Sequence, residues 1–139
     1  MKNLITLLVM VMALPVWAID KIYFGSCGKQ YKEMPILNAI AKDDPDVFIF
    51  LGDNIYGDTE NMLELKQKYD VLGQHQGFQK LKRTAELIAI WDDHDYGEND
   101  AGKEYPKKEA SRKIMLDFWQ EPKNSARYSR DGIYTSYMY

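Results

Sequence analysis

The stretch from Leu87 to Asp95 reads Leu-Ile-Ala-Ile-Trp-Asp-Asp-His-Asp, an apolar run that ends in three carboxylates and a histidine. A solvated loop needs no such apolar run, whereas a strand through a hydrophobic core does. We therefore expect Ile88, Ala89 and Ile90 to lie in a buried strand that delivers the polar residues at its carboxyl end. Ligands bind at this end of the strands in open α/β sheets. Carboxylates and imidazole also hold metal ions and transfer protons.

Two other apolar segments end in polar residues in the same way. Lys21–Gly25 is a short β-rich run followed by Ser26 and Cys27. Val47–Leu51 is continuously apolar, as expected of a strand covered on both faces, and it leads into Gly52-Asp53-Asn54. If the three strands lie side by side, the three polar clusters meet at one edge of the sheet.

Helical patterns occupy the segments between and after these strands. Pro35 suits the first turn of one helix, and Asn61 with Glu64 forms a capping-box pattern ahead of a second. A shorter helix is expected around residues 78–81, and residues 107–119 read as the last helix. Two apolar faces are predicted, one in each longer helix: Met62, Leu65, Tyr69 and Leu72, and then Ala110, Ile114 and Phe118. The order of these elements predicts a layered α/β domain with a mainly parallel sheet.

The first 18 residues are typical of a secretory signal peptide, with a positive start, an apolar segment over Leu4–Leu14 and a cleavage context ending at Ala18. Residues 19–139 would then form one exported domain, periplasmic or secreted, without a membrane span. Of the 18 basic residues one, Lys2, lies in this leader, so 17 basic residues remain against 21 acidic ones, a net charge of −4. This balance argues against a non-specific nucleic-acid-binding protein.

Three candidate ligands have both a structural and a functional interpretation. Cys27 is the single cysteine, and it is either a buried small hydrophobe or a metal-bound thiolate. Gly52-Asp53-Asn54 is either a plain turn or a loop that brings the Asp53 carboxylate and the Tyr56 phenol to one point. Tyr56 itself is either a ring packed over that loop or a metal ligand.

The residues after the Leu87–Trp91 run also allow two interpretations. Asp92 and Asp93 form either an acidic surface turn or a carboxylate pair whose repulsion a cation compensates. Either of the two can face that cation. His94 can contact a phosphate or protonate a leaving group, because its ordinary pKa lies near neutrality.

Taken together, these clusters resemble the PhoD-like alkaline phosphatases of the metallophosphoesterase superfamily. The matching pieces occur in the family's order: Phe24–Cys27, Leu51–Asp58, and Trp91–Gly97 followed by Asn99-Asp100. The resemblance implies a layered α/β/β/α sandwich, of which this sequence contains the N-terminal β-α-β-α-β half. It also implies Fe³⁺ and Ca²⁺ at a site similar to that of purple acid phosphatases.

The same resemblance assigns roles to individual residues. Cys27, Asp53 and Tyr56 resemble metal ligands, with Asp53 bridging two ions. The pair Asp93-His94 is similar to the superfamily's Asn-His element, in which the first residue binds metal and the histidine assists the phosphate. Asp92 is the alternative ligand to Asp93, and Asn54 and His94 are the expected substrate contacts.

The superfamily has further ligands, usually His and Asp, but this sequence has no histidine after His94. We therefore expect either a fragment or a truncated relative, with one apolar face of the sheet uncovered. The expected function is an exported metal-dependent phosphoesterase that hydrolyses phosphate mono- or diesters with a metal-activated water. The alternative is a secreted calcium- or partner-binding module that keeps the fold without turnover.

Overall fold

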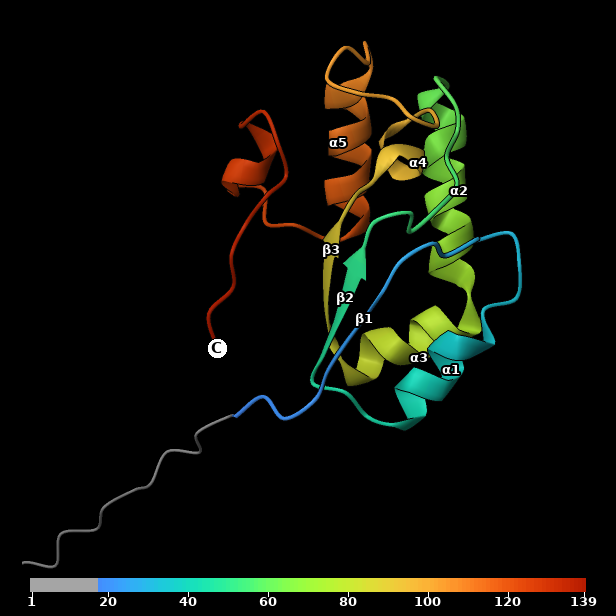
Figure 1. Cartoon of the computed structure of the whole chain (residues 1–139), viewed down its shortest axis with the longest axis vertical. Helices are drawn as coiled ribbons and strands as arrows, with labels where there is room; N and C mark the ends of the chain where they lie inside the picture. Colours follow the sequence, from blue (N-terminus) through green and yellow to red (C-terminus); the bar gives the residue numbers. More distant parts are fainter. Residues whose placement is uncertain (1–17) are drawn as a thin grey trace, which may run out of the picture.

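The computed structural model describes residues 18–139 and has a mixed α/β fold (Figure 1). Strands β1 (Ile22–Gly25), β2 (Val47–Leu51) and β3 (Glu86–Ile90) form a parallel sheet in the order β1-β2-β3. The predicted α/β class and parallel sheet are confirmed. The predicted leader, residues 1–18, lies outside the described residues apart from Ala18. None of the helices among residues 18–139 is long and apolar enough to cross a membrane.

Five α-helices accompany the sheet in the described part of the chain: α1 (Pro35–Lys42), α2 (Met62–Gln74), α3 (Gln76–Thr84), α4 (Asp93–Tyr96) and α5 (Lys108–Phe118). Pro35 begins α1 as expected. Asn61 caps α2 by accepting hydrogen bonds from the backbone N–H groups of Leu63 and Glu64. The Glu64 carboxylate does not complete the predicted capping box, because it accepts from Thr59 and pairs with Lys68 instead.

The hydrophobic core lies between one face of the sheet and the helices on that side (Figure 1). Phe48 and Phe50 of β2 and Ala89 of β3 point into it. The helices bury Leu37 and Ala41 of α1, Leu65, Tyr69 and Leu72 of α2, Phe78 and Leu81 of α3, and Met115 and Leu116 of α5. The predicted face of the last helix was wrong in part, because Ser111, Met115 and Leu116 are buried while Ala110 is exposed.

The other face of the sheet is largely open. Side chains alternate along a strand, so Phe24, Leu51 and Ile90 share this second face, and their exposed fractions are 69%, 46% and 40%. The prediction that β2 is covered on both faces was therefore wrong in part, because Val47 on this second face is buried while Leu51 is exposed. Ile90 was expected in the core but is exposed as well. The helices cover one side only, which leaves the uncovered apolar face that the sequence led us to expect.

The segment after α5 passes beside β3, where the short 3₁₀ helix η1 (Ala126–Tyr128) supplies a buried arginine. Arg127 donates from Nη2 to the Ala89 carbonyl of β3 at 2.7 Å and from Nε to the Ile133 carbonyl at 2.8 Å. Its Nη1 pairs with Glu121 at 2.8 Å. The Arg127 side chain thus occupies this carbonyl of β3, and residues 132–139 form no strand beside it.

We predict that Arg127→Met lowers the free energy of unfolding by about 3–5 kcal/mol, because the change leaves the Glu121 carboxylate without its buried partner. Urea unfolding followed by circular dichroism measures this loss. Arg83→Met on the exposed side of α3 serves as the control and should change the value by no more than about 0.5 kcal/mol. Equal stabilities of the two variants would contradict the role given to Arg127.

Candidate metal centre

The loops after the three strands meet at the carboxyl edge of the sheet, as the sequence predicts. The backbone N–H of Cys27 donates to the Gly52 carbonyl at 3.3 Å, and that of Gly28 donates to the Asp53 carbonyl at 2.7 Å. These bonds join the loop after β1 to the loop after β2. The loops after β2 and β3 meet where the Gly57 N–H donates to the His94 carbonyl at 3.0 Å.

The side chain of Asp95 holds the second and third of these loops together. It is fully buried and accepts hydrogen bonds from the backbone N–H groups of Asn54 at 3.1 Å, Ile55 at 2.9 Å and Asp92 at 3.1 Å. Burial raises the pKa of Asp95 to about 7, although the same backbone hydrogen bonds act to lower it. One buried carboxyl group therefore fixes the relative positions of Asp53 and Asp93.

The backbone at this edge adopts conformations that few residues favour. Gly52 has a φ of +102°, and a Cβ placed there would lie 2.7 Å from the Asp92 Cβ, so only glycine fits. Asp53 and Cys27 have φ values of +49° and +61°, in the left-handed region that is uncommon for residues other than glycine. Such backbone strain is concentrated at functional sites.

Three side chains at this edge form a compact group of potential metal ligands. Asp53, Asp93 and His94 each offer one ligand atom, and these three atoms lie within 4.8 Å of one another. The Oδ1 atom of Asp53 is buried and has no hydrogen-bond partner among the described residues. An unpaired buried carboxylate oxygen is costly unless a cation or donor compensates it, so the donor set fits a metal ion.

Cys27 and Tyr56 flank this group. The Cys27 thiol lies 3.6 Å from Oδ2 of Asp53 and is exposed, so the interpretation as a buried hydrophobe was wrong. Burial, followed by the nearby charges of Asp53 and Cys27, raises the pKa of the Tyr56 phenol to about 12. The Tyr56 ring packs on the His94 ring with 4.1 Å between centroids. The structure thus brings Cys27, Asp53, Tyr56, Asp93 and His94 into one site.

His94 is oriented by Asp58, 2.5 Å from its Nδ1 atom. A carboxylate only accepts hydrogen bonds, so Nδ1 carries the hydrogen and Nε2 remains the nitrogen available to a ligand. Partial burial acts to lower the pKa of His94, but the hydrogen bond and charge of Asp58 together with the charges of Asp53 and Asp93 raise it overall.

The two adjacent carboxylates after β3 have different positions. Asp93 belongs to the ligand group, and its Oδ2 atom accepts from the Asp100 N–H at 2.6 Å. This hydrogen bond is the main cause that lowers the pKa of Asp93, against a smaller opposing effect of burial. Asp92 lies outside the group, and its Oδ1 atom caps α4 by accepting from the Asp93 N–H at 3.0 Å. The prediction of Asp92 as a metal ligand is therefore replaced by a capping role.

Asn54 does not have the position of a substrate contact. Its side chain is 1% exposed and donates to the Ile90 carbonyl at 2.8 Å and to Asp95 at 3.3 Å. The amide N–H₂ group is therefore fully used within the protein. Asn54 is a structural residue of the loop, and the expected substrate-binding role is not what its contacts indicate.

Three residues that support the site were not identified from the sequence. Asp58 and Asp95 lie within the motifs already quoted, but nothing in their spacing distinguishes a supporting carboxylate from a ligand. Gln30 is buried, and its side-chain amide accepts a hydrogen bond from the Tyr56 N–H at 2.8 Å and donates one to the Tyr56 carbonyl at 3.2 Å. A polar residue five positions after the end of β1 carries no pattern that predicts this contact.

We predict that Asp95→Ala lowers the free energy of unfolding by at least about 3 kcal/mol, because three backbone N–H groups lose their acceptor at about 1–3 kcal/mol each. Urea unfolding measures the change. Glu98→Ala, in the exposed loop that follows α4, is the control and should stay within about 0.5 kcal/mol of the parent chain. An Asp95→Ala chain as stable as this control would contradict the role of Asp95.

Comparison with known proteins identified no relative of this chain. No family model, curated protein or solved structure matches the chain. The resemblance drawn from the three sequence segments therefore stays a prediction, and the function is argued from the residues at the carboxyl edge of the sheet.

Proposed function

We propose that the chain forms part of a metal-dependent phosphoesterase that hydrolyses phosphate mono- or diesters with a metal-activated water, as in the PhoD-like alkaline phosphatases. The proposal includes the family's layered α/β/β/α sandwich, with Fe³⁺ and Ca²⁺ as the metals. It also includes export of the protein to the periplasm or the outside of the cell.

The observation that carries the proposal is the group of three ligand atoms from Asp53, Asp93 and His94, which lie within 4.8 Å of one another. Asp53 also has a buried carboxylate oxygen, Oδ1, without a hydrogen-bond partner among the described residues. Two carboxylates this close repel each other unless a cation lies between them. Structural ion-pair networks provide such a cation from Lys or Arg, but no Lys or Arg of the described residues pairs with either carboxylate.

Each side chain of the site has a proposed task. Asp53 and Asp93 would supply hard oxygen ligands, as Fe³⁺ and Ca²⁺ prefer, and Cys27 and Tyr56 would supply a sulfur and an oxygen ligand beside Asp53. When bound, the metal ions would polarise the phosphoryl oxygens and lower the pKa of the attacking water. His94, held through Nδ1 by Asp58, presents Nε2 to the phosphate or to the leaving oxygen.

We predict that Asp53→Asn reduces hydrolysis of p-nitrophenyl phosphate or bis(p-nitrophenyl) phosphate by at least about 100-fold, because losing a ligand removes several kcal/mol of charge stabilisation. The variant keeps the size of the side chain, and asparagine tolerates the left-handed backbone of this position. Metal content by mass spectrometry of the purified protein accompanies the assay, and a chelator should abolish activity that Fe³⁺ and Ca²⁺ restore.

Glu98→Gln removes a carboxylate outside the ligand group and serves as the matched control with unchanged activity. Activity that survives both chelation and Asp53→Asn would overturn the proposal. The rival function, a calcium- or partner-binding module without turnover, predicts a different pattern: Ca²⁺ raises the melting temperature, and no phosphate ester is hydrolysed by the parent chain.

A further inference from the structure

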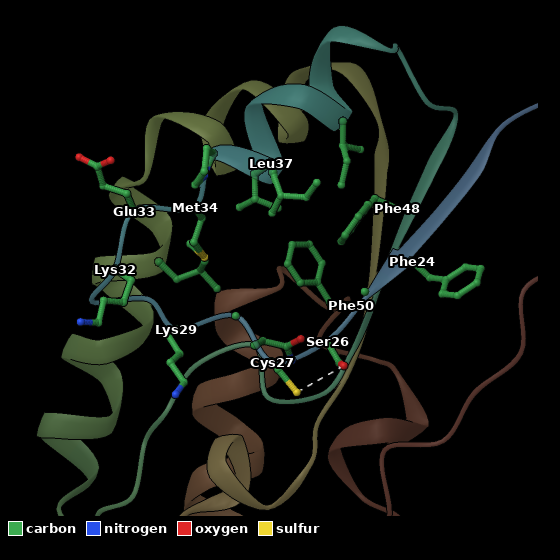
Figure 2. A pocket seen from close by; sticks show the side chains of 17 residues that line it. Phe24, Ser26, Cys27, Lys29, Lys32, Glu33, Met34, Leu37, Phe48 and Phe50 are labelled. Carbon is green, nitrogen blue, oxygen red and sulfur yellow. Dashed lines mark hydrogen bonds between the residues drawn. The ribbon is translucent and has the colours of Figure 1, made fainter.

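The cavity beside the candidate metal centre has no role in the chemistry described so far. It has a volume of about 400 Å³ and lies under the loop that joins β1 to α1 (Figure 2). Figure 2 shows Met34, Leu37, Phe48 and Phe50 gathered around it, while Phe24 points away toward the open face of the sheet. Its walls therefore come from the β1–α1 loop, α1 and the covered face of the sheet.

The lining of this cavity suits an apolar group. Leu37, Phe48 and Phe50 are each at least nine-tenths buried, and Met34 is a flexible side chain that adapts to different shapes. An apolar cavity of about 150 Å³ holds one benzene ring. The present volume therefore accommodates a two-ring aromatic group or a branched alkyl group of similar size.

Two residues connect the cavity to the ligand group. Cys27 lines the cavity, and its thiol lies 3.6 Å from Asp53. Lys29 also lines the cavity, and its ammonium group lies 5.0 Å from the centroid of the Tyr56 ring. A cation therefore lies where the cavity approaches the metal ligands, at the position that the negative end of a bound ester would reach.

We propose that this cavity binds the apolar alcohol part of the substrate, an aromatic or branched alkyl group, while Lys29 attracts the phosphate end. The inference rests on the proposed function in that it treats the bound molecule as a substrate, but the binding itself requires no catalysis. It selects phosphate esters of apolar alcohols over phosphate esters of small or polar alcohols.

Isothermal titration of the whole chain with 2-naphthol and with 2-naphthyl phosphate tests the cavity directly. The parent chain should bind both, and the phosphate more tightly. Met34→Trp fills the cavity and should weaken binding of both ligands at least about tenfold. Lys29→Met should weaken binding of 2-naphthyl phosphate alone. Ile40→Trp, from the α1 wall, replaces Met34→Trp should that variant not fold.

Leu63→Trp on the exposed surface of α2 and Lys82→Met on α3 are the matched controls, with unchanged binding expected. The proposal is overturned if 2-naphthol fails to bind the parent chain at about 1 mM, if the filled cavity binds as well as the parent, or if Lys29→Met leaves the phosphate ligand unaffected. Absence of metal binding and of hydrolysis would overturn the proposed function but not the proposed binding in the cavity. Hydrolysis without naphthol binding would overturn only the role proposed for the cavity.

Discussion

The buried carboxyl group of Asp95 is the constraint on which the candidate site depends. It accepts hydrogen bonds from three backbone N–H groups, those of Asn54, Ile55 and Asp92. These groups belong to two loops that are distant in the sequence. Buried N–H groups without an acceptor are costly, so the two loops have one favourable arrangement relative to each other. That arrangement brings Asp53 next to Asp93 and His94. The ligand group is thus a consequence of a residue that is not itself a ligand.

The site joins negative side chains that would repel one another without compensation. Asp53 and Asp93 lie together in the ligand group, and Asp58 lies against His94. Holding carboxylates this close costs folding energy, which a bound cation offsets. The left-handed backbone of Cys27 and Asp53 adds to the same cost. A functional role would explain why the chain keeps a site whose close carboxylates and left-handed residues cost folding energy. This cost therefore supports the proposed metal centre.

Much of the fold follows from local patterns in the sequence. The continuous apolar run Val47–Leu51 matches β2 residue for residue, Pro35 begins α1, and Asn61 caps α2. The meeting of the polar clusters was predictable because parallel strands place their carboxyl ends at one edge. The coverage of β2 was not predictable from its own residues, because an apolar run has the same pattern whether one face or both are packed. The open face was expected only from the family resemblance.

The candidate site was predictable as a set of residues but not as a set of roles. Asp92, Asp93 and Asp95 are chemically identical and lie within four consecutive residues, yet one caps a helix, one is a potential ligand and one is a buried support. The same holds for Asn54, whose amide is used by Ile90 and Asp95. For Asp95 and Asn54 the deciding contacts join residues about 40 positions apart in the sequence, which local spacing does not indicate, whereas the capping contact of Asp92 is with the next residue.

The most direct test of this account is the affinity of the chain for Mn²⁺, measured by isothermal titration in the parent chain and in Asp95→Asn. The variant should bind Mn²⁺ at least about tenfold more weakly, although Asp95 is not a ligand, because supporting residues around metal ligands have effects of this size. Far-ultraviolet circular dichroism establishes that the variant keeps its helices. Undiminished Mn²⁺ affinity in a folded Asp95→Asn chain, or no Mn²⁺ binding by the parent, would contradict the account.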